Sequence, residues 1–234
     1  MLTVHDLHVS YRGAPVLERC SAEFVEGAVH GIVGRNGAGK TTLMEALFGF
    51  IRSSSGTALF RGKPLAQNQI GYLPTENFFY SFMTGLEYLQ IVAGGGPMEA
   101  AGKWAEIFEV PLDRYVDHYS AGMKKKLALL GVVMLGRPVL LLDEPMNRLD
   151  LQSNLLLGNL LRELATRGTT VLVSSHVFES LTAVSDKVHL LSGGRVERSF
   201  ERHEFDSLRG SLSDVEAEAR LNDLRTLLDA VPGS

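Results

Sequence analysis

A glycine-rich segment that ends in a lysine and a threonine has the composition and spacing needed to bind phosphate groups. Gly34, Gly39, Lys40 and Thr41 fit the pattern G-x-x-x-x-G-K-T, and the segment follows the apolar run 28–33. Glycines let main-chain N–H groups approach crowded phosphate oxygens that side chains would block. The helix expected to begin near Lys40 adds the positive end of its dipole. We therefore expect a bound nucleoside triphosphate, the alternative being a chance match.

Each residue of this loop has an expected role in holding the triphosphate. Lys40 is expected to bridge the β- and γ-phosphates and to act in catalysis. The Thr41 hydroxyl is expected to bind Mg²⁺, which prefers oxygen ligands and keeps water and phosphate oxygens as the others. The complete set of predicted nucleotide-binding residues in the loop is Gly34, Arg35, Asn36, Gly37, Ala38, Gly39, Lys40, Thr41 and Thr42.

Two consecutive acids follow a second apolar run about a hundred residues later. The run Val139–Leu142 is wholly apolar, as expected for a strand buried on both faces of a parallel sheet. Asp143 and Glu144 follow it, at the end of the strand where open α/β sheets bind ligands. Asp143 would hold Mg²⁺ through water, and Glu144 would polarise the attacking water. Paired acids after a strand are also common as solvated loop residues, so this assignment depends on the phosphate-binding loop.

The composition excludes several classes of protein. The chain has 234 residues, of which 45% are hydrophobic, and a formal net charge of −4. The length fits one large domain or a core with a small insert. The negative charge argues against a nucleic-acid binder that works by bulk charge. The single cysteine, Cys20, excludes a disulfide within the chain and is typical of a reducing compartment.

The sequence also lacks the signals of membrane insertion and secretion. No apolar run reaches 18 residues, so no membrane-spanning helix is expected. The first residues have neither a basic region nor an apolar region, so a secretory signal is not expected.

Hydrophobic patterning predicts strands at the start of the chain, helices in its middle and an alternation of both afterwards. Thr84 and Glu87 have the spacing of a capping box, and Ser120 is the expected N-cap of a helix through Leu135. The other expected strands are 2–11, 16–24, 57–61, 171–174, 187–191 and 196–200, and the other expected helices are 98–108, 151–166, 178–184 and 213–230. This order predicts an α/β nucleotide-binding core with a helical insert at about 77–136.

The ordered set of motifs resembles the ATPase subunit of ATP-binding-cassette (ABC) transporters over residues 2 to about 200. Tyr119–Leu127 resembles the family signature, in the Ser-x-Gly-Met-Lys variant that is common among bacterial exporters. Asn147–Asp150 resembles the loop after the acidic strand, and Ser174–His176 resembles the segment that carries the switch histidine. Tyr11 lies where the family has an aromatic residue that stacks on adenine.

The resemblance implies an α/β P-loop NTPase fold with an N-terminal antiparallel β subdomain and a helical insert subdomain. It places an ABC ATPase domain at 1–212 and leaves 213–234 as a C-terminal helical tail. It implies ATP and Mg²⁺ as cofactors, with Thr41 and Asp143 as metal ligands and Thr75 as a further candidate. It also implies Glu144, His176 and Lys40 as the catalytic residues.

Three of the implied roles have simpler alternatives. Ser120 and Gly122 would contact the ATP of a second subunit, because a helix N-terminus presents N–H groups to an anion, but Ser120 could merely cap its helix. Tyr11 could be an ordinary surface tyrosine at a strand end. His176 would orient the γ-phosphate, although a lone histidine is more often structural.

Several residues depart from the family pattern. Thr75 stands where the family usually has a glutamine, and Glu76 is one residue out of register. The shorter threonine is expected to act on the metal only through water. Ala121 and Met123 replace a glycine and a glutamine of the signature. Arg148 replaces a usually small residue next to the subunit interface. Together these departures put in question the rate of ATP hydrolysis and the way in which the nucleotide state is signalled.

Two further groups of side chains allow more than one interpretation. The lysines at 124–126 are expected to form a solvated helix face rather than a binding patch. The aromatic cluster, defined as Phe78, Phe79, Tyr80, Phe82 and Met83, suits either the docking of a short helix from a membrane subunit or the core of the helical insert.

The leading hypothesis is an ATP-hydrolysing transporter subunit that works as a dimer, with export favoured, on a separate multi-span permease. It would be cytoplasmic and held at the inner face of the membrane by that permease, with no nucleic-acid partner. One alternative is a soluble ABC-type ATPase that acts on DNA or the ribosome. Another is a regulatory nucleotide-binding subunit with low hydrolysis, which Thr75 and Ala121 motivate.

Overall fold

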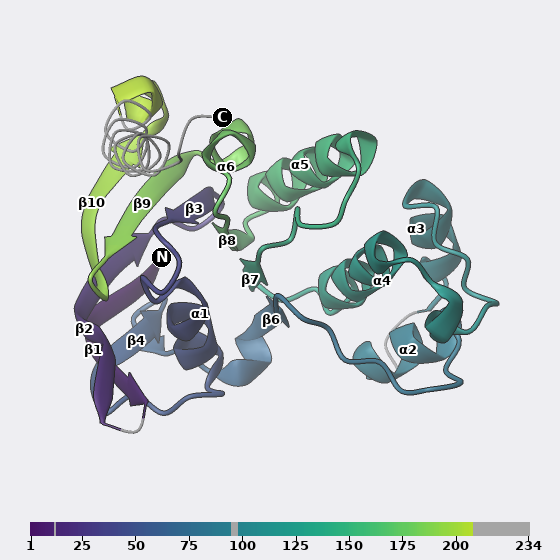
Figure 1. Cartoon of the computed structure of the whole chain (residues 1–234), viewed down its shortest axis with the longest axis horizontal. Helices are drawn as coiled ribbons and strands as arrows, with labels where there is room; N and C mark the ends of the chain where they lie inside the picture. Colours follow the sequence, from purple (N-terminus) through teal and green to yellow (C-terminus); the bar gives the residue numbers. More distant parts are fainter. Residues whose placement is uncertain (12, 95–97, 208–234) are drawn as a thin grey trace, which may run out of the picture.

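The computed structural model describes residues 1–11, 13–94 and 98–207 and contains two sheets, one antiparallel and one mostly parallel (Figure 1). The antiparallel sheet has the order β2-β1-β4-β5. Its strands are β1 (Leu2–Tyr11), β2 (Ala14–Phe24), β4 (Ser55–Phe60) and β5 (Lys63–Pro64). This sheet is the predicted N-terminal antiparallel subdomain.

The second sheet has the order β10-β9-β3-β8-β7-β6 and is parallel except for the β9–β10 hairpin. Its strands are β3 (Val29–Val33), β6 (Ile70–Leu73), β7 (Val139–Asp143), β8 (Thr170–Ser174), β9 (Lys187–Ser192) and β10 (Arg195–Glu201). The carboxyl ends of β3, β7 and β8 therefore meet at one edge, which is where the predicted loop and acids follow.

Helix α1 (Lys40–Phe48) lies between the two sheets, and α5 (Leu151–Thr166) and α6 (Phe178–Val184) cover the opposite face of the parallel sheet (Figure 1). Strand β7 shows why its sequence is continuously apolar. Leu141 packs with Leu43 of α1 in one buried cluster, whereas Leu140 packs with Leu157 of α5 in the other. Because successive side chains of a strand point to opposite faces, both faces must be apolar.

The helical insert leaves the core after β6 and returns at β7 (Figure 1). It contains α2 (Gly85–Val92), α3 (Ala101–Ile107), α4 (Ala121–Met134) and a short 3-10 turn at Val116–His118. Two further 3-10 turns lie outside the insert, at Gln67–Gln69 before β6 and at Arg202–Glu204 after β10. Thr84 caps α2 through the predicted capping box with Glu87, and Ser120 caps α4 by accepting from the Met123 N–H at 3.2 Å. None of the helices in the described ranges is long and apolar enough to cross a bilayer.

The predicted elements agree with the structure to within a few residues. The helix expected over 98–108 is shorter and spans Ala101–Ile107. The strand expected over 57–61 begins earlier, at Ser55. The predicted tail 213–234 lies outside the described residues.

Candidate active site

The loop between β3 and α1 has the backbone geometry of a phosphate cradle. Gly37 and Gly39 have φ of 82° and 104°, a region that side chains with a Cβ rarely adopt. A Cβ at Gly34 would collide with the Leu191 carbonyl oxygen, so this position also requires glycine. A Cβ at Gly37 would meet no atom within 4 Å, which leaves open space beside the loop.

Lys40 begins α1 and turns its side chain back over the loop. Its Nζ donates to the carbonyl oxygens of Gly34 at 2.6 Å and Arg35 at 3.1 Å. Burial lowers the pKa of Lys40, and the carboxylates of Glu144 and Asp143 oppose this shift. The ammonium group is thus held at the mouth of the cradle.

Asp143 is the centre of a hydroxyl cluster at the end of β7. Asp143 is only 1% exposed. Its Oδ2 accepts hydrogen bonds from the hydroxyls of Thr41 and Thr75, each at 2.7 Å. Its Oδ1 accepts from the Ser174 hydroxyl at the end of β8. Asp143 and both threonines, from three separate segments, thus present oxygen atoms to one point.

Glu144 has a strained backbone, with φ of 49° in a residue that is not glycine. Its N–H donates to the Ser174 hydroxyl at 3.0 Å, and its Oε2 lies 3.0 Å from Nδ1 of His176. The Glu144 carboxylate is mostly buried, whereas the His176 ring is about half exposed. The structure therefore brings together Glu144, the predicted catalytic carboxylate, and His176, the predicted switch histidine.

Of the residues described above, Lys40, Thr41, Asp143 and Glu144 line a cleft of about 420 Å³. The lining residues are Val16, Asn36, Gly37, Gly39, Lys40, Thr41, Thr42, Asp143 and Glu144. One cation, several main-chain N–H groups and a hydroxyl–carboxylate pair suit a polyphosphate with a hard divalent cation. Within the described part of the chain, no group of three or more His, Cys, Asp or Glu side chains is arranged to hold a metal ion.

The predicted nucleotide-binding residues outside the loop 34–42, namely Tyr11, Ser120 and Gly122, do not line this cleft. Tyr11 is 44% exposed at the end of β1, and its hydroxyl donates to Oε2 of Glu45 at 3.1 Å. Ser120 and Gly122 lie at the start of α4 in the insert. A Cβ at Gly122 would come within 2.8 Å of the Arg148 carbonyl oxygen, so this glycine also allows the loop 147–150 to pack on α4.

The expectation that residues 124–126 form a solvated helix face is wrong for two of the three lysines. Lys125 and Lys126 are buried, because α4 is covered on most sides by the core and by α2. The Nζ of Lys125 donates to the carbonyl oxygens of Pro74, Thr75 and Asp143 at 3.2, 3.3 and 3.4 Å. Burial lowers the pKa of Lys125 to about 8, and the charges of Asp143 and Glu76 oppose this shift.

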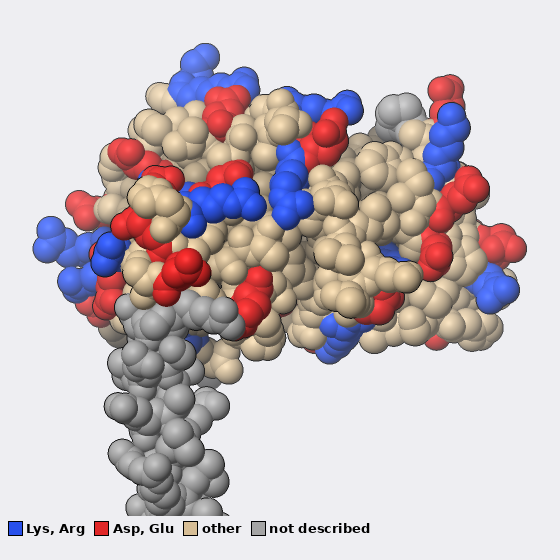
Figure 2. All heavy atoms as spheres, turned by 90° about the horizontal axis from the view of Figure 1, so that it is seen from above, with Lys and Arg blue, Asp and Glu red and all other residues tan. Residues whose placement is uncertain are grey.

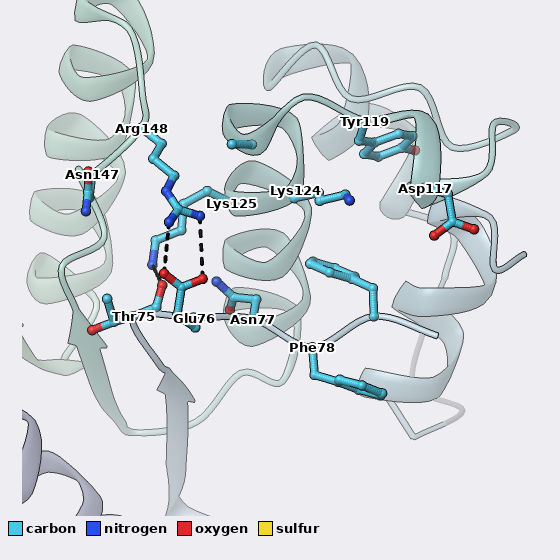
Figure 3. Close-up of a pocket in the computed structure, with 12 residues that line it drawn as sticks. Thr75, Glu76, Asn77, Phe78, Asp117, Tyr119, Lys124, Lys125, Asn147 and Arg148 are labelled. Atoms are coloured by element: carbon cyan, nitrogen blue, oxygen red, sulfur yellow. Dashed lines mark hydrogen bonds and ion pairs between the residues drawn. The ribbon is translucent and has the colours of Figure 1, made fainter. Parts of the chain in front are cut away.

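Residues Thr75 and Glu76, next to the family's glutamine position, form different contacts. The Thr75 hydroxyl donates to Asp143, a contact that the sequence did not predict, because its loop runs close to the end of β7. Glu76 is exposed and forms an ion pair with Arg148 at 2.9 Å (Figure 3). Neither Lys125 nor Ser174 was assigned a role from the sequence, because the contacts of both join segments far apart in the chain.

The aromatic cluster divides between the two interpretations. Phe79 packs against the core of the insert, whereas Phe78, Tyr80 and Phe82 are 74%, 62% and 79% exposed. A groove of about 350 Å³ lies next to Phe78, between the core and the insert. Its lining includes Phe48, Tyr72, Phe78, Tyr88, Val92, Leu135 and Arg137.

Comparisons with known proteins agree on one family. The family model described as ABC transporter matches residues 17–147. An uncharacterized ABC transporter ATP-binding protein of Nostoc is 29% identical over 226 residues, which cover 90% of this chain and 66% of that protein. A solved structure described as an ATP binding subunit of an ABC transporter superposes with a TM-score of 0.81 and 26% identity, over 90% of this chain and 93% of that one.

Two further relatives carry a substrate in their names. The cobalt import ATP-binding protein CbiO of Salmonella typhimurium is 30% identical and covers 84% of this chain and 79% of its own length. The bacitracin transport ATP-binding protein BcrA of Enterococcus faecalis is 29% identical, with coverage of 84% and 68%. The chain spans 66% of the length of the Nostoc protein.

Proposed function

The chain belongs to the ABC transporter family, and from this premise we propose that it is the ATP-binding and ATP-hydrolysing subunit of a transporter. The observation that carries the proposal is the cleft in which Lys40, Thr41, Asp143 and Glu144 converge. The family match, the fold and these four side chains support the same function. The names of the relatives include cobalt import and bacitracin transport, so the substrate and the direction of transport are left open.

The phosphates of ATP would be held by the loop 34–42. Lys40 would exchange its two carbonyl partners for the β- and γ-phosphate oxygens, which are stronger acceptors because they are charged. The N-terminus of α1 would add its dipole, and Gly37 leaves room for the phosphates. These interactions stabilise charge that develops during phosphoryl transfer.

Mg²⁺ fits the oxygen atoms of Thr41 and Asp143, with Thr75 as a third candidate, and when bound it would neutralise charge on the β- and γ-phosphates. Glu144 would accept a proton from the attacking water. His176, which lies 3.0 Å from the Glu144 carboxylate, would hold this acid in place and contact the γ-phosphate. Ser174 would fix both acids by bonding the Asp143 carboxylate and the Glu144 N–H.

We infer that a second copy completes the site. Ser120 and the first N–H groups of α4 lie in the insert, outside the cleft that holds Lys40. In a head-to-tail pair, this helix N-terminus would face the γ-phosphate bound by the other copy. Tyr11 would contact the adenine ring from the first copy.

We also infer that a multi-span membrane subunit docks on the groove between the core and the insert. The exposed Phe78 and the apolar lining of the groove suit an amphipathic helix of that subunit, and Arg137 would pair with an acidic group on it. The protein would then be peripheral at the cytoplasmic face of the membrane.

The test is Glu144→Gln, which keeps the size of the side chain but removes its basicity. ATP binding, measured by calorimetry, is expected to persist, and phosphate release is expected to fall by about 100- to 10,000-fold, as for other general bases. Gel filtration with ATP and Mg²⁺ should show a trapped dimer.

Glu163→Gln is the matched control, because Glu163 is exposed on α5 and pairs only with Arg167 among the ion pairs of the described residues. It should turn over ATP as the native protein does. Turnover at the native rate by Glu144→Gln would show that Glu144 is not the base. Failure of the native protein to bind ATP at millimolar concentration would overturn the whole proposal.

A regulatory subunit with low hydrolysis is the second candidate, because Thr75 binds the same Asp143 oxygen as Thr41 in place of the family glutamine. Rapid phosphate release by the purified chain alone would exclude this candidate. For action on DNA or the ribosome we find no support: on the face seen in Figure 2, basic side chains are interspersed with acidic ones.

A further inference from the structure

Lys125 has an unusual environment for a lysine at the start of a helix. The residue is 4% exposed, and its ammonium group has three N–H donors, which is the number of carbonyl oxygens within hydrogen-bond distance. A buried ammonium without such partners would be strongly unfavourable. Figure 3 shows the side chain extending from α4 toward Thr75.

The three carbonyl groups belong to the two segments that carry the predicted metal ligands. Pro74 and Thr75 follow β6, and the Thr75 hydroxyl in turn bonds Oδ2 of Asp143 at 2.7 Å. Asp143 ends β7. Lys125 therefore contacts the backbone of both partners in the Thr75–Asp143 hydrogen bond.

A second set of contacts holds the same loop against α4. Arg148 forms an ion pair with Glu76, and the Arg148 carbonyl oxygen packs where Gly122 has no side chain. The loop 74–76 is thus fixed to α4 on one side by Lys125 and on the other by Arg148. The hollow between them has a volume of about 440 Å³ and is lined by both side chains.

We propose that Lys125 is a positioning residue: its ammonium group fixes the segment 74–75 and the end of β7 relative to α4, and so sets the placement of the oxygen atoms of Thr75 and Asp143. This role rests on the proposed function, because those oxygens are the candidate Mg²⁺ ligands. It also joins the start of α4, which would face the ATP on the other copy, to the metal ligands of its own cleft. A change in the orientation of α4 would then reach Asp143 through one side chain.

The experiment compares the native protein with Lys125→Met, Thr75→Val and the double variant. Methionine keeps the length of the stem but removes all three donors. ATP binding without Mg²⁺, measured in EDTA, depends on the loop 34–42 and should be unchanged in Lys125→Met. The kcat or the apparent affinity for Mg²⁺ should fall by about 10- to 100-fold, as is typical when a supporting partner of a metal ligand is removed.

The double variant distinguishes positioning from a general loss of stability. If Lys125 acts through Thr75, Thr75→Val should add little to the effect of Lys125→Met. Lys103→Met, at an exposed position of α3, is the control and should retain native kinetics. Should Lys125→Met fail to fold, Lys125→Gln, which retains two donors, is measured in its place against the same criteria.

Two results would overturn the inference. One is a native kcat and a native Mg²⁺ dependence in Lys125→Met; the other is full additivity of the two substitutions. Both leave the proposed function intact, since the native protein would still hydrolyse ATP. Absence of ATP binding or turnover by the native protein would instead overturn the proposed function itself.

Discussion

At the scale of single residues, Ser174 links the two acids of the candidate site. It is fully buried at the end of β8, donates to the Asp143 carboxylate and accepts from the Glu144 N–H. One hydroxyl thereby sets the direction of the Asp143 carboxylate, the candidate metal ligand, and bonds the strained backbone of Glu144, the candidate general base. Neither partner is near Ser174 in the sequence.

Ser174→Ala is expected to lower kcat by about 10- to 100-fold, as for other partners of metal ligands. It should also lower the free energy of unfolding by about 1–3 kcal/mol, because a buried N–H and a buried carboxylate oxygen lose their partner. Phosphate release and denaturant unfolding measure the two effects.

Ser185→Ala is the matched control. Ser185 is also fully buried, but its hydroxyl has no hydrogen-bond partner within the described structure. Its removal should leave both kcat and the free energy of unfolding at or above the native value. A native kcat in Ser174→Ala would show that the two acids are positioned without it.

At the scale of elements, β3 and β9 share a buried pair of histidines. Nε2 of His30 lies 2.9 Å from the Val25 carbonyl oxygen, which can only accept, so this nitrogen carries the proton. The bare Nδ1 of His30 then accepts from Nε2 of His189 at 3.1 Å, and Nδ1 of His189 accepts from the Ser199 hydroxyl at 2.8 Å. Every donor meets an acceptor only while both rings are neutral.

This pair predicts a loss of stability in acid. Burial lowers the pKa of His30, and burial together with the charge of His30 lowers the pKa of His189 to about 3. Because the unfolded chain takes up protons near pH 6.5, stability is complete above about 6.5 and falls as the pH drops toward 3, by about 1.4 kcal/mol per pH unit for each proton.

Unfolding by denaturant at several pH values between 7.5 and 4.5 measures this slope, and His189→Gln is the comparison. The variant should be less stable than the native protein at pH 7.5 but should lose less stability on acidification. Equal slopes in the two proteins would show that the histidine pair does not determine the pH dependence.

The elements that the sequence predicts well are those whose pattern is local. The caps Thr84 and Ser120, the helix 151–166 and the loop before Lys40 depend on residues within a few positions of one another, and they are where the sequence places them. The solvated face expected at 124–126 is wrong because burial of Lys125 depends on the loop at 74–75, which is fifty residues away in the chain. The contacts of Ser174, Thr75 and Arg148 could not be predicted from the sequence for the same reason.

At the scale of the whole molecule, the exposed part of the aromatic cluster lies apart from the candidate ATP site. Phe78 lines the groove between the core and the insert, while the candidate phosphate-binding residues line a separate cleft. Large exposed apolar side chains beside a groove are typical of protein contacts.

Phe78→Ser is therefore expected to leave ATP binding and hydrolysis by the purified chain unchanged and to weaken its co-purification with the multi-span protein of an adjacent reading frame. Leu155→Ser, which removes another exposed apolar side chain, from α5, should leave co-purification intact. Loss of binding in both variants, or in neither, would contradict docking at the groove.

The path of the chain between β6 and β7 has one more consequence. These strands are parallel neighbours, and parallel neighbours need a crossover connection, which α4 provides by itself. Residues 77–119 are thus an excursion added to a connection that would be complete without them. Because none of them lines the candidate cleft, a change in their length or surface need not alter the strand order or the residues of that cleft. This arrangement would allow the same ATP-binding core to work with different partners.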